Sequence, residues 1–352
     1  MSEGKHLVGV DIGSSSIKVC ELKEGRRGAR QLVRFAYHPL PPQTIVDGHI
    51  INSAAVVEGL DKLFHKQKNR DVALRVSGHS VIIKKITMPL MTSAELREQI
   101  NWEAEQHIPF DLAEVEIDWQ VLQQRQEQGQ MDVLLVAAKK EEVNDLTNIA
   151  AEAKLRPRVV DLDAFTVQNA FEVTQQGGIP TDRTIALIHV GASLTTLNIL
   201  SAGTTAFTRD IANGGNQITE EIQRSLGISA EEAEAYKCGG DGRGLVPREV
   251  PEIVQQVVEQ LAGEIQRSLD FYLATSGEGE VHRVVVSGGT ANIRALLDAI
   301  ERRARVPVEL LDPLRIAEAA PKADDASLLQ ARAAQAAVAF GLALRREREK
   351  LQ

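Results

Sequence analysis

The chain has 352 residues, of which 43% are hydrophobic and 25% are charged, and its formal net charge is -9. This length suits about two domains, and the composition is ordinary for a globular protein in water. The negative charge disfavours nucleic acids and anionic membranes as partners. No apolar run is long enough to span a bilayer, the first residues lack a signal-peptide pattern, and the only two cysteines, Cys20 and Cys238, fit a reducing cytosol.

The first predicted element is a β-hairpin near the N-terminus. Leu7–Ile12 has the apolar character of a buried strand, Gly13–Ser16 is a turn of small residues, and Ile17–Leu22 forms the return strand. A tight turn between two strands exposes backbone N–H groups at its tip.

A similar unit opens the second half of the chain. Ile185–Val190 leads through Gly191–Ser193 into Leu194–Leu200. Asp11 and His189 hold matching places in the two units, and 189 − 11 = 178, which is about half of the 352 residues. A repeat at half the chain length predicts two related lobes, each beginning with its own hairpin.

A segment of different character, 38–135, separates the two hairpins. It contains a candidate strand pair, a helix with a capping box that ends before Pro109, and a further hairpin around a polar turn. We expect these elements to form a small α+β subdomain inserted in the first lobe. Their ranges are Val72–Val76 with Val81–Ile86, the helix from Thr92-Ser-Ala-Glu95, and Trp119–Leu122 with Met131–Val136.

The second half is richer in helices, of which the clearest has Pro251 at its start and one apolar stripe. The predicted elements are helices Gln217–Leu226, Ser229–Lys237 with Ser229 as N-cap, and Pro251–Leu273, a strand His282–Ser287, a helix from Asn292, and an Ala-rich helix within Ser327–Arg345.

These elements predict the following division of an α/β chain. The first lobe core comprises 1–37, 136–180 and 326–345, with the insert at 38–135; the second lobe core comprises 181–216 and 281–325, with a helical subdomain at 217–280 and a tail at 346–352.

The first hairpin turn has the residues of a phosphate-binding loop. Gly13 lets an anion approach the backbone closely, and Ser14–Ser16 add hydroxyl and N–H donors. Lys18 could reach a phosphate, and Asp11 sits at a strand end where a carboxylate can hold hydrated Mg²⁺. The alternative is a polar hairpin turn without a ligand, which is about as common.

The second turn offers Gly191, Ser193 and Thr195 in comparable places. Its alternative is again a plain hairpin, and His189 alone is more often a structural histidine than a ligand. Two such turns facing each other are less easily explained by chance than either one.

Three further motifs have both a functional and a structural interpretation. The Gly288-Gly289 turn could lie flat against a base or ribose, or simply connect a strand to a helix. Asn213–Asn216 could likewise contact the ligand or simply begin the next helix. Glu234 and Lys237 could bracket a ribose or base, or form an exposed helical ion pair.

Asp163 follows a predicted strand and precedes a predicted helix. Its carboxylate could orient a water at a γ-phosphate. A helix N-cap would give the same sequence pattern and is the more common explanation for one aspartate in this position.

Taken together, the ordered motifs resemble the superfamily of actin, hexokinase and Hsp70, whose fold has two phosphate loops, two connecting segments and an adenosine loop. The resemblance implies a two-lobed actin-like (ribonuclease H-like) α/β fold, and the insert is similar to that of FtsA. It also implies nucleotide contacts from Gly13, Ser14, Ser15, Ser16, Lys18, Gly191, Ala192, Ser193, Thr195, Gly214, Gly215, Asn216, Glu234, Lys237, Gly288, Gly289 and Asn292, with Asp11 and His189 near Mg²⁺ and Asp163 positioning water.

Within that superfamily the chain is similar to the PilM family of type IV pilus assembly. The stretches that carry the similarity are Val10–Lys18, Met88-Pro-Leu, Trp102–Phe110, Asn213–Thr219 and Ile265–Tyr272. The resemblance implies ATP binding in the cytoplasm, beside the inner membrane. It also implies that the short cytoplasmic N-terminal tail of PilN binds in a groove beside the insert, with other pilus membrane and motor components as further candidate partners.

Two departures from the superfamily pattern bear on catalysis. His189 stands where an Asp near the metal is usual, and the shorter Asp163 stands where hydrolysing relatives carry Glu or Gln. Loss of one well-placed catalytic group often costs roughly 10²–10³-fold in rate. We therefore expect tight nucleotide binding with slow or absent hydrolysis.

Two other functions fit the same fold. A polymerising, FtsA-like ATPase of cell division usually ends in an amphipathic membrane helix, whereas 344–352 has no large apolar face. A sugar kinase needs a sugar pocket and a general-base aspartate, for which no signature is evident.

Overall fold

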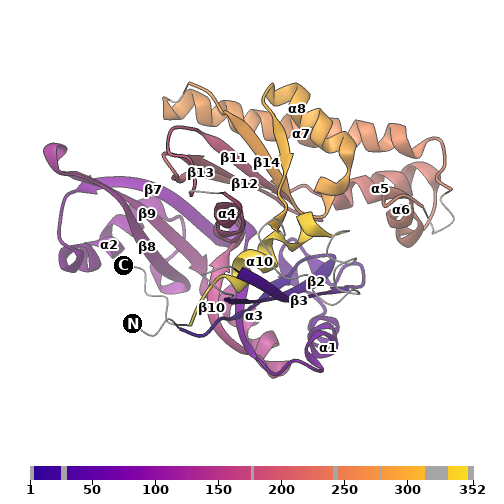
Figure 1. Cartoon of the computed structure of the whole chain (residues 1–352), viewed down its shortest axis with the longest axis horizontal. Coiled ribbons are helices and arrows are strands. Elements are labelled where there is room, and N and C mark those ends of the chain that lie inside the picture. The colour runs from indigo at the N-terminus through magenta and orange to yellow at the C-terminus, as the bar shows by residue number, and fades with distance from the viewer. Residues whose placement is uncertain are drawn as a thin grey trace.

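The computed structural model describes residues 4–24, 30–175, 178–240, 245–277, 279–313 and 332–347. Within them, two five-stranded sheets form the centres of two lobes, and a three-stranded sheet projects from one side (Figure 1). The predicted two-lobe organisation with an inserted subdomain is therefore present.

The first-lobe sheet has the strand order β10-β6-β1-β2-β3. β1 pairs antiparallel with β2 and parallel with β6, which in turn pairs parallel with β10. The antiparallel pair of β1 and β2 confirms the first predicted hairpin. The strands are β1 Val8–Ile12, β2 Ser16–Glu24, β3 Arg30–Pro39, β6 Asp71–Val76 and β10 Arg156–Leu162.

The second-lobe sheet repeats this arrangement strand for strand in the order β13-β12-β11-β14-β15. β11 pairs antiparallel with β12 and parallel with β14, and β14 pairs parallel with β15. The repeat predicted from Asp11 and His189 therefore extends to the whole sheet. The strands are β11 Ile185–Val190, β12 Thr195–Ser201, β13 Thr204–Ile211, β14 Arg283–Ser287 and β15 Val308–Leu310.

Two helices lie between the sheets: α4, Asp163–Thr174, and α10, Ala337–Ala343 (Figure 1). Their apolar side chains form one buried cluster with residues of both sheets. Gly341 is required there, because a side-chain carbon would lie 1.8 Å from the carbonyl oxygen of Thr166. The predicted Ala-rich helix thus packs closely through small residues in its described part, while 327–331 lie outside the described residues.

Apart from α2 of the insert, the remaining described helices cover the outer faces of the two sheets. α1 Ser53–Phe64 and α3 Lys140–Glu152 share a core with the first sheet. α5 Gly215–Leu226, α6 Ala230–Lys237, α7 Val250–Ser276 and α8 Arg294–Ala304 accompany the second sheet. Ser229 caps α6 as predicted, and Pro251 is the second residue of α7. α8 begins two residues after Asn292, because Thr290–Asn292 forms a 3-10 turn.

The inserted subdomain has its own sheet and its own core. Its strand order is β7-β9-β8, with β7 Val81–Pro89, β8 Val115–Arg125 and β9 Gln130–Lys139. α2, Ser93–His107, packs on it and begins with the predicted capping box. The hairpin predicted from Trp119 and Met131 is confirmed by the pairing of β8 with β9.

One prediction about the insert is wrong. Residues 72–76 do not pair with 81–86, since β6 lies between β1 and β10 while β7 pairs with β9. α1 and the two-stranded ribbon of β4, Ile45–Val46, and β5, His49–Ile50, also belong outside the insert sheet. A strand buried on both faces is typical of the interior of a parallel sheet. The short turn after Val76 has the local sequence pattern of a hairpin, although the strands on its two sides belong to different sheets. The other domain boundaries remain a proposed division.

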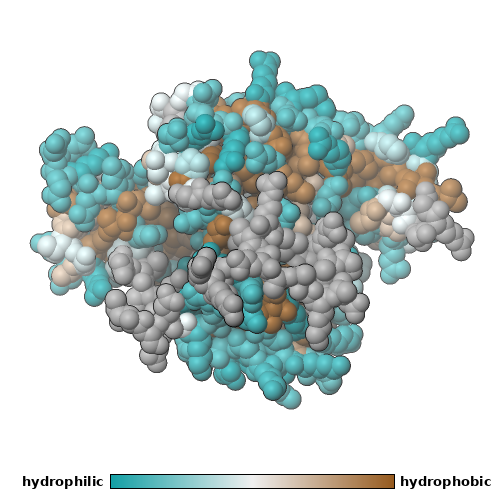
Figure 2. Space-filling model, in the orientation of Figure 1, coloured by the Kyte–Doolittle hydropathy of each residue, from teal (hydrophilic) through white to brown (hydrophobic). Residues whose placement is uncertain are grey.

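Hydrophilic side chains dominate the ends of both lobes and of the insert in Figure 2. No helix among the described residues has the length and apolar character needed to cross a membrane.

Candidate functional site

The first predicted loop is closed by its own backbone. The N–H of Gly13 donates to the carbonyl of Ser16 at 3.0 Å, and the N–H of Ser16 donates back at 3.3 Å. No hydrogen bond between described residues uses the amide N–H of Ser14 or Ser15. Two amide donors are therefore presented at the tip of the turn.

The second loop repeats this geometry and is braced by the helix that follows it. The N–H of Gly191 donates to Leu194 O at 2.9 Å, while the N–H groups of Gly215 and Asn216 donate to Gly191 O and Ala192 O at 3.0 and 2.7 Å. Among the described residues, no partner is found for the amides of Ala192 and Ser193.

The two loops meet although they come from opposite lobes. Ser193 Oγ donates to Ser14 Oγ at 2.8 Å, and the side-chain amide of Asn216 donates to Ser193 Oγ at 3.2 Å. Four unpaired amides and two hydroxyls are thus brought to one junction. Successive backbone N–H groups in a turn form a concave site suited to an anion.

The Gly288-Gly289 turn also reaches this junction. Gly288 has a φ of +96°, and a side-chain carbon there would lie 2.2 Å from the carbonyl oxygen of Val190. Thr290 Oγ1 donates to Gly191 O at 2.9 Å and leaves no room for a Cβ on Gly215, which would lie 2.4 Å away. These glycines therefore allow the backbones around the second loop to pack closely.

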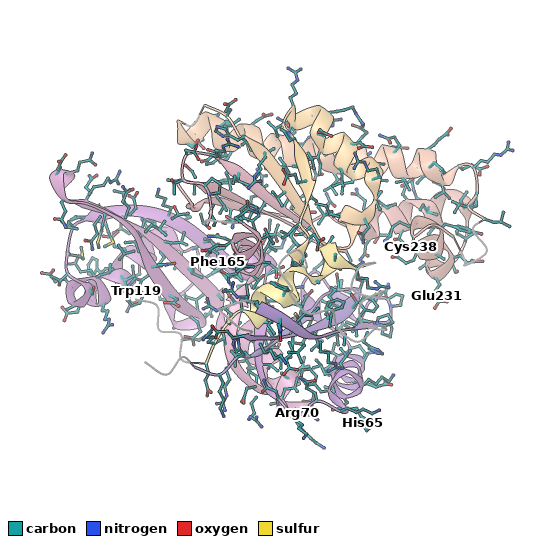
Figure 3. The ribbon with its side chains drawn as sticks, in the orientation of Figure 1. His65, Arg70, Trp119, Phe165, Glu231 and Cys238 are labelled. Atoms are coloured by element: carbon teal, nitrogen blue, oxygen red, sulfur yellow. The ribbon has the colours of Figure 1, made fainter. Side chains whose placement is uncertain are left out.

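Glu234 and Lys237 lie beside this turn and bind each other and helix α5. Lys237 Nζ contacts Glu234 Oε2 and donates to Gly215 O at 3.2 Å and to Thr219 Oγ1 at 2.9 Å. The lysine is mostly buried, whereas the glutamate side chain is half exposed, so the pair lies at the edge of the surface. Nearby, Glu231 and Cys238 lie on α6 and directly after it, at the outer end of the lobe (Figure 3).

A buried charge cluster lies under the first loop. Asp11 contacts Lys18 Nζ through Oδ2 at 3.1 Å and Arg75 Nε through Oδ1 at 3.0 Å. Arg75 also donates to Asp163 Oδ2 at 2.9 Å and to Ile12 O at 3.2 Å. The arginine, from β6, thereby joins two aspartates from β1 and α4.

The carboxyl groups of this cluster have opposite pKa shifts. Burial would raise the pKa of Asp11, but Lys18 and Arg75 outweigh it and lower the pKa to about 2. Burial raises the pKa of Asp163 to about 7, because the nearby carboxylates reinforce burial against the attraction of Arg75. Burial lowers the pKa of His189 to about 4, so this imidazole is neutral near pH 7.

Asp163 is the first residue of α4 but does not cap it. Leu162 holds the N-cap position, and no side chain accepts the capping hydrogen bond. One carboxylate oxygen, Oδ1, is buried with no hydrogen-bond partner among the described residues. Phe165, on the next part of the same helix and labelled in Figure 3, packs against the core that α1 and α3 share with the first sheet. The aspartate is held by Arg75 instead of by the helix.

The surroundings of Asp11 and His189 do not fit a magnesium ion in this arrangement. Mg²⁺ needs oxygen ligands in a strict octahedron, whereas each oxygen of Asp11 already faces a cationic side chain. His189 Nδ1 lies 3.0 Å from Ser287 Oγ, and a ring nitrogen is a poor ligand for this ion. Within the described ranges, no group of three or more His, Cys, Asp or Glu side chains could hold a metal.

Arg75 and Asp210 are the main residues of this region that the sequence did not single out. Asp210 Oδ2 accepts from the N–H of Gly78 at 3.0 Å and so links the second lobe to the chain after β6. A signal for Arg75 was available, because an arginine inside the apolar run Asp71–Val76 must have a partner if the strand is buried. Because the strand was predicted to belong to the insert, the need of Arg75 for a buried partner was not recognised.

Comparison with known proteins is consistent with this geometry. The family of type IV pilus assembly protein PilM matches residues 9–347. A chain in the solved PilM–PilN type IV pilus biogenesis complex is 28% identical, with a TM-score of 0.84 over 97% of this chain and 98% of that chain.

Two more distant structures share the fold alone. EutJ, an ethanolamine utilization protein from Carboxydothermus hydrogenoformans, is 15% identical with a TM-score of 0.57, over 97% of this chain and 89% of its own. MreB 5 of Spiroplasma citri, solved with AMPPNP, is 13% identical with a TM-score of 0.51, over 96% and 94%. These likenesses confirm the predicted two-lobed actin-like fold. Because the family match spans nearly the whole chain, the protein belongs to the family of type IV pilus assembly protein PilM.

Proposed function

We propose that this protein is a nucleotide-loaded adaptor of type IV pilus assembly. ATP would bind across the two loop tips, hold the lobes together and be hydrolysed slowly or not at all. In this state the protein would bind the N-terminal cytoplasmic tail of PilN, which would keep it at the cytoplasmic side of the inner membrane.

The observation that carries the proposal is the hydrogen bond between Ser193 and Ser14. It brings together two turns from different lobes whose amide N–H groups have no partner among the described residues. Amides in this geometry bind phosphate groups, and Lys18 adds a positive charge beside them.

The glycine turn and α6 would hold the other end of the nucleotide. Gly288, Gly289 and Asn292 lie at the end of β14, and Asn292 is exposed. Glu234 and Lys237 already fix each other next to Gly215. We propose that these residues contact the base and ribose, as the arrangement of the motifs along the chain predicts.

Slow hydrolysis follows from the contacts of Asp163. A carboxylate that orients an attacking water must accept a hydrogen bond from that water. One oxygen of Asp163, Oδ2, instead accepts from Arg75 at 2.9 Å, and the other, Oδ1, is buried away from solvent, so neither oxygen is presented to a water in this arrangement. Turnover of ATP faster than about one per second, the low end of ordinary enzymes, would contradict this part of the proposal.

The partner is proposed from the solved PilM–PilN complex, whose chain aligns along nearly the whole length of this one. Other inner-membrane and motor components of the pilus are further candidates. The fold supplies a route by which nucleotide could affect a partner beside the insert. β7 of the insert contacts β13 of the second lobe, and Asp210 of β13 binds the backbone just before β7.

The test combines Lys18→Ala with the matched control Lys23→Ala, an exposed lysine on the same strand. ATP affinity and the affinity for a peptide of the PilN N-terminus are measured on the full chain. We expect Lys18→Ala to weaken ATP binding by about tenfold or more, and to weaken peptide binding until ATP is saturating. Lys23→Ala should behave as wild type. Equal peptide affinity of the nucleotide-free and nucleotide-loaded protein would overturn the adaptor model.

Polymerisation and sugar phosphorylation remain alternatives that no described contact favours. The likeness to MreB 5 shows the fold alone. Sedimentation with ATP would reveal polymers, and a phosphotransfer screen across sugars would reveal a kinase.

A further inference from the structure

We propose that Arg75 takes the place of a divalent cation at this site, so that the protein binds its nucleoside triphosphate without Mg²⁺. The proposal rests on the proposed nucleotide site and specifies the form of the ligand: the metal-free polyphosphate.

Two cationic groups converge beneath the first loop. A side-chain carbon placed on Gly13 would lie 3.1 Å from Lys18 Nζ and 3.6 Å from Arg75 Nη2. The two positive charges therefore lie close to one point, next to the unpaired amides of Ser14 and Ser15. A metal-free triphosphate carries up to four negative charges and needs this kind of neutralisation.

The hydrogen bonds that the structure describes for Arg75 leave one of its N–H groups without a partner. A guanidinium has five N–H groups. Four are used: one from Nε to Asp11, two from Nη1 to Ser77 and Asp163, and one from Nη2 to Ile12 O. The fifth belongs to Nη2 and has no partner among the described residues; Nη2 is the atom of the arginine that lies nearest to a side-chain carbon placed on Gly13.

The position of this arginine is fixed by three elements. Its contacts come from β1, from the start of α4 and from the residues just after its own strand, and it is largely buried. Arginine also stays charged at every physiological pH. The site thus contains a permanent cation in a rigid place, which a lysine on a flexible stem would not provide.

The same contacts exclude the usual place for the metal. Asp11 lies on β1 two residues before Gly13, and both of its oxygens face cationic nitrogens. A divalent ion bound there would face Arg75 and Lys18 at short range, and His189 offers a nitrogen in place of an oxygen. Repulsion and a poor ligand set both act against the ion.

The test is the affinity for ATP by titration calorimetry, on full-length protein stripped of co-purified nucleotide, in excess Mg²⁺ and in excess EDTA. We expect the two dissociation constants to agree within about threefold. Binding that needs Mg²⁺ overturns the inference but leaves the nucleotide site intact. Binding under neither condition overturns the nucleotide site itself.

Substitutions of Arg75 test whether this residue is responsible for ATP binding without Mg²⁺. Arg75→Met should lower the affinity in EDTA by about tenfold or more and recover part of it in Mg²⁺, because Asp11 is released from one cation. Arg75→Met combined with Asp163→Asn tests the same point without a buried unpaired carboxylate on α4. Arg224→Met, on the exposed face of α5, is the control and should match wild type. Equal EDTA affinities for wild type and both Arg75 variants would overturn the role of Arg75.

Discussion

The two loops share one backbone design but differ in what lies beneath them. Under the first loop, ion pairs link Lys18 to Asp11, Asp11 to Arg75 and Arg75 to Asp163, and all four side chains are largely buried. Under the second loop are a neutral histidine, Ser287 and Thr290, which make uncharged hydrogen bonds. The backbone design is therefore repeated in both lobes, whereas the ion pairs that Asp11 makes with Lys18 and Arg75 lie under the first loop.

This difference gives the lobes separate tasks. The first lobe supplies fixed charge, which can neutralise an anion. The second lobe supplies backbone amides held by closely packed glycines, which can bind the same anion only if the lobes stay together. Variants on the two sides should therefore fail in different ways.

The largest expected effect is on the charged side. Arg75→Met leaves Asp11 and Asp163 buried with one cation fewer, and removal of one partner from a buried pair typically costs about 3–5 kcal/mol. Urea unfolding without nucleotide measures it. The double variant with Asp163→Asn should recover part of the loss, and a single variant as stable as wild type would show that the cluster is not a coupled charge network.

A smaller effect is expected on the close-packed side. Gly288→Ala places a methyl group against Val190 O in a left-handed backbone, which we expect to cost about 2–3 kcal/mol in unfolding free energy. Gly277→Ala is the matched control, because Gly277 has a φ of +75° but no atom within 4 Å of the added carbon. It should cost only about 1 kcal/mol. Equal losses would mean that packing around the second loop contributes little.

The sequence alone was sufficient to predict the elements that depend on local patterns. The two hairpins, the capping box at Thr92, the N-cap at Ser229 and the long helix from Pro251 all appear where period, caps and turns predict them. The repeat of Asp11 and His189 even predicted that both loops belong to equivalent sheets.

Two properties of the site could not be predicted because they depend on long-range pairing. The position of β6 is set by its parallel neighbours β1 and β10, which are far away in sequence, and a parallel register leaves no local turn signal. Once β6 was misplaced, Arg75 could not be connected with Asp11, 64 residues earlier, or with Asp163, 88 residues later. The cluster under the first loop therefore emerged only from the structure.

The pH dependence of the folding stability is a further difference that we expect between the two sides. Since the folded state lowers the pKa of His189 from 6.5 to about 4, the unfolded state binds more protons between these values. The contribution of His189 to the free energy of unfolding is thus present above pH 6.5 and is lost as the pH falls toward 4. The loss amounts to about 2 kcal/mol after allowance for partial exposure. Asp163 has the opposite sign, because its raised pKa makes stability fall as the pH rises from 3.8 to about 7.

Each of these two pH dependences of the unfolding free energy can be removed by a single substitution. His189→Gln should abolish the loss of stability toward pH 4, and Asp163→Asn should abolish the loss toward pH 7, in unfolding free energies measured at several pH values. If both variants keep the wild-type profile, other groups control the pH dependence.

The smallest effect concerns the bond that joins the two sides. Ser193→Ala and Ser14→Ala each remove the same hydroxyl contact between the lobes, and a hydrogen bond of this kind contributes about 1 kcal/mol. If the contact acts as one unit, the double variant should cost clearly less than the sum of the two single variants, with a coupling of about 0.5–1 kcal/mol. Additive losses in the free protein would mean that the hydroxyls do not couple the lobes in solution. In that case the lobes would be held together by their shared core and by contacts such as that of Asp210 with Gly78, and a coupling between the two loops should appear only once ATP is added.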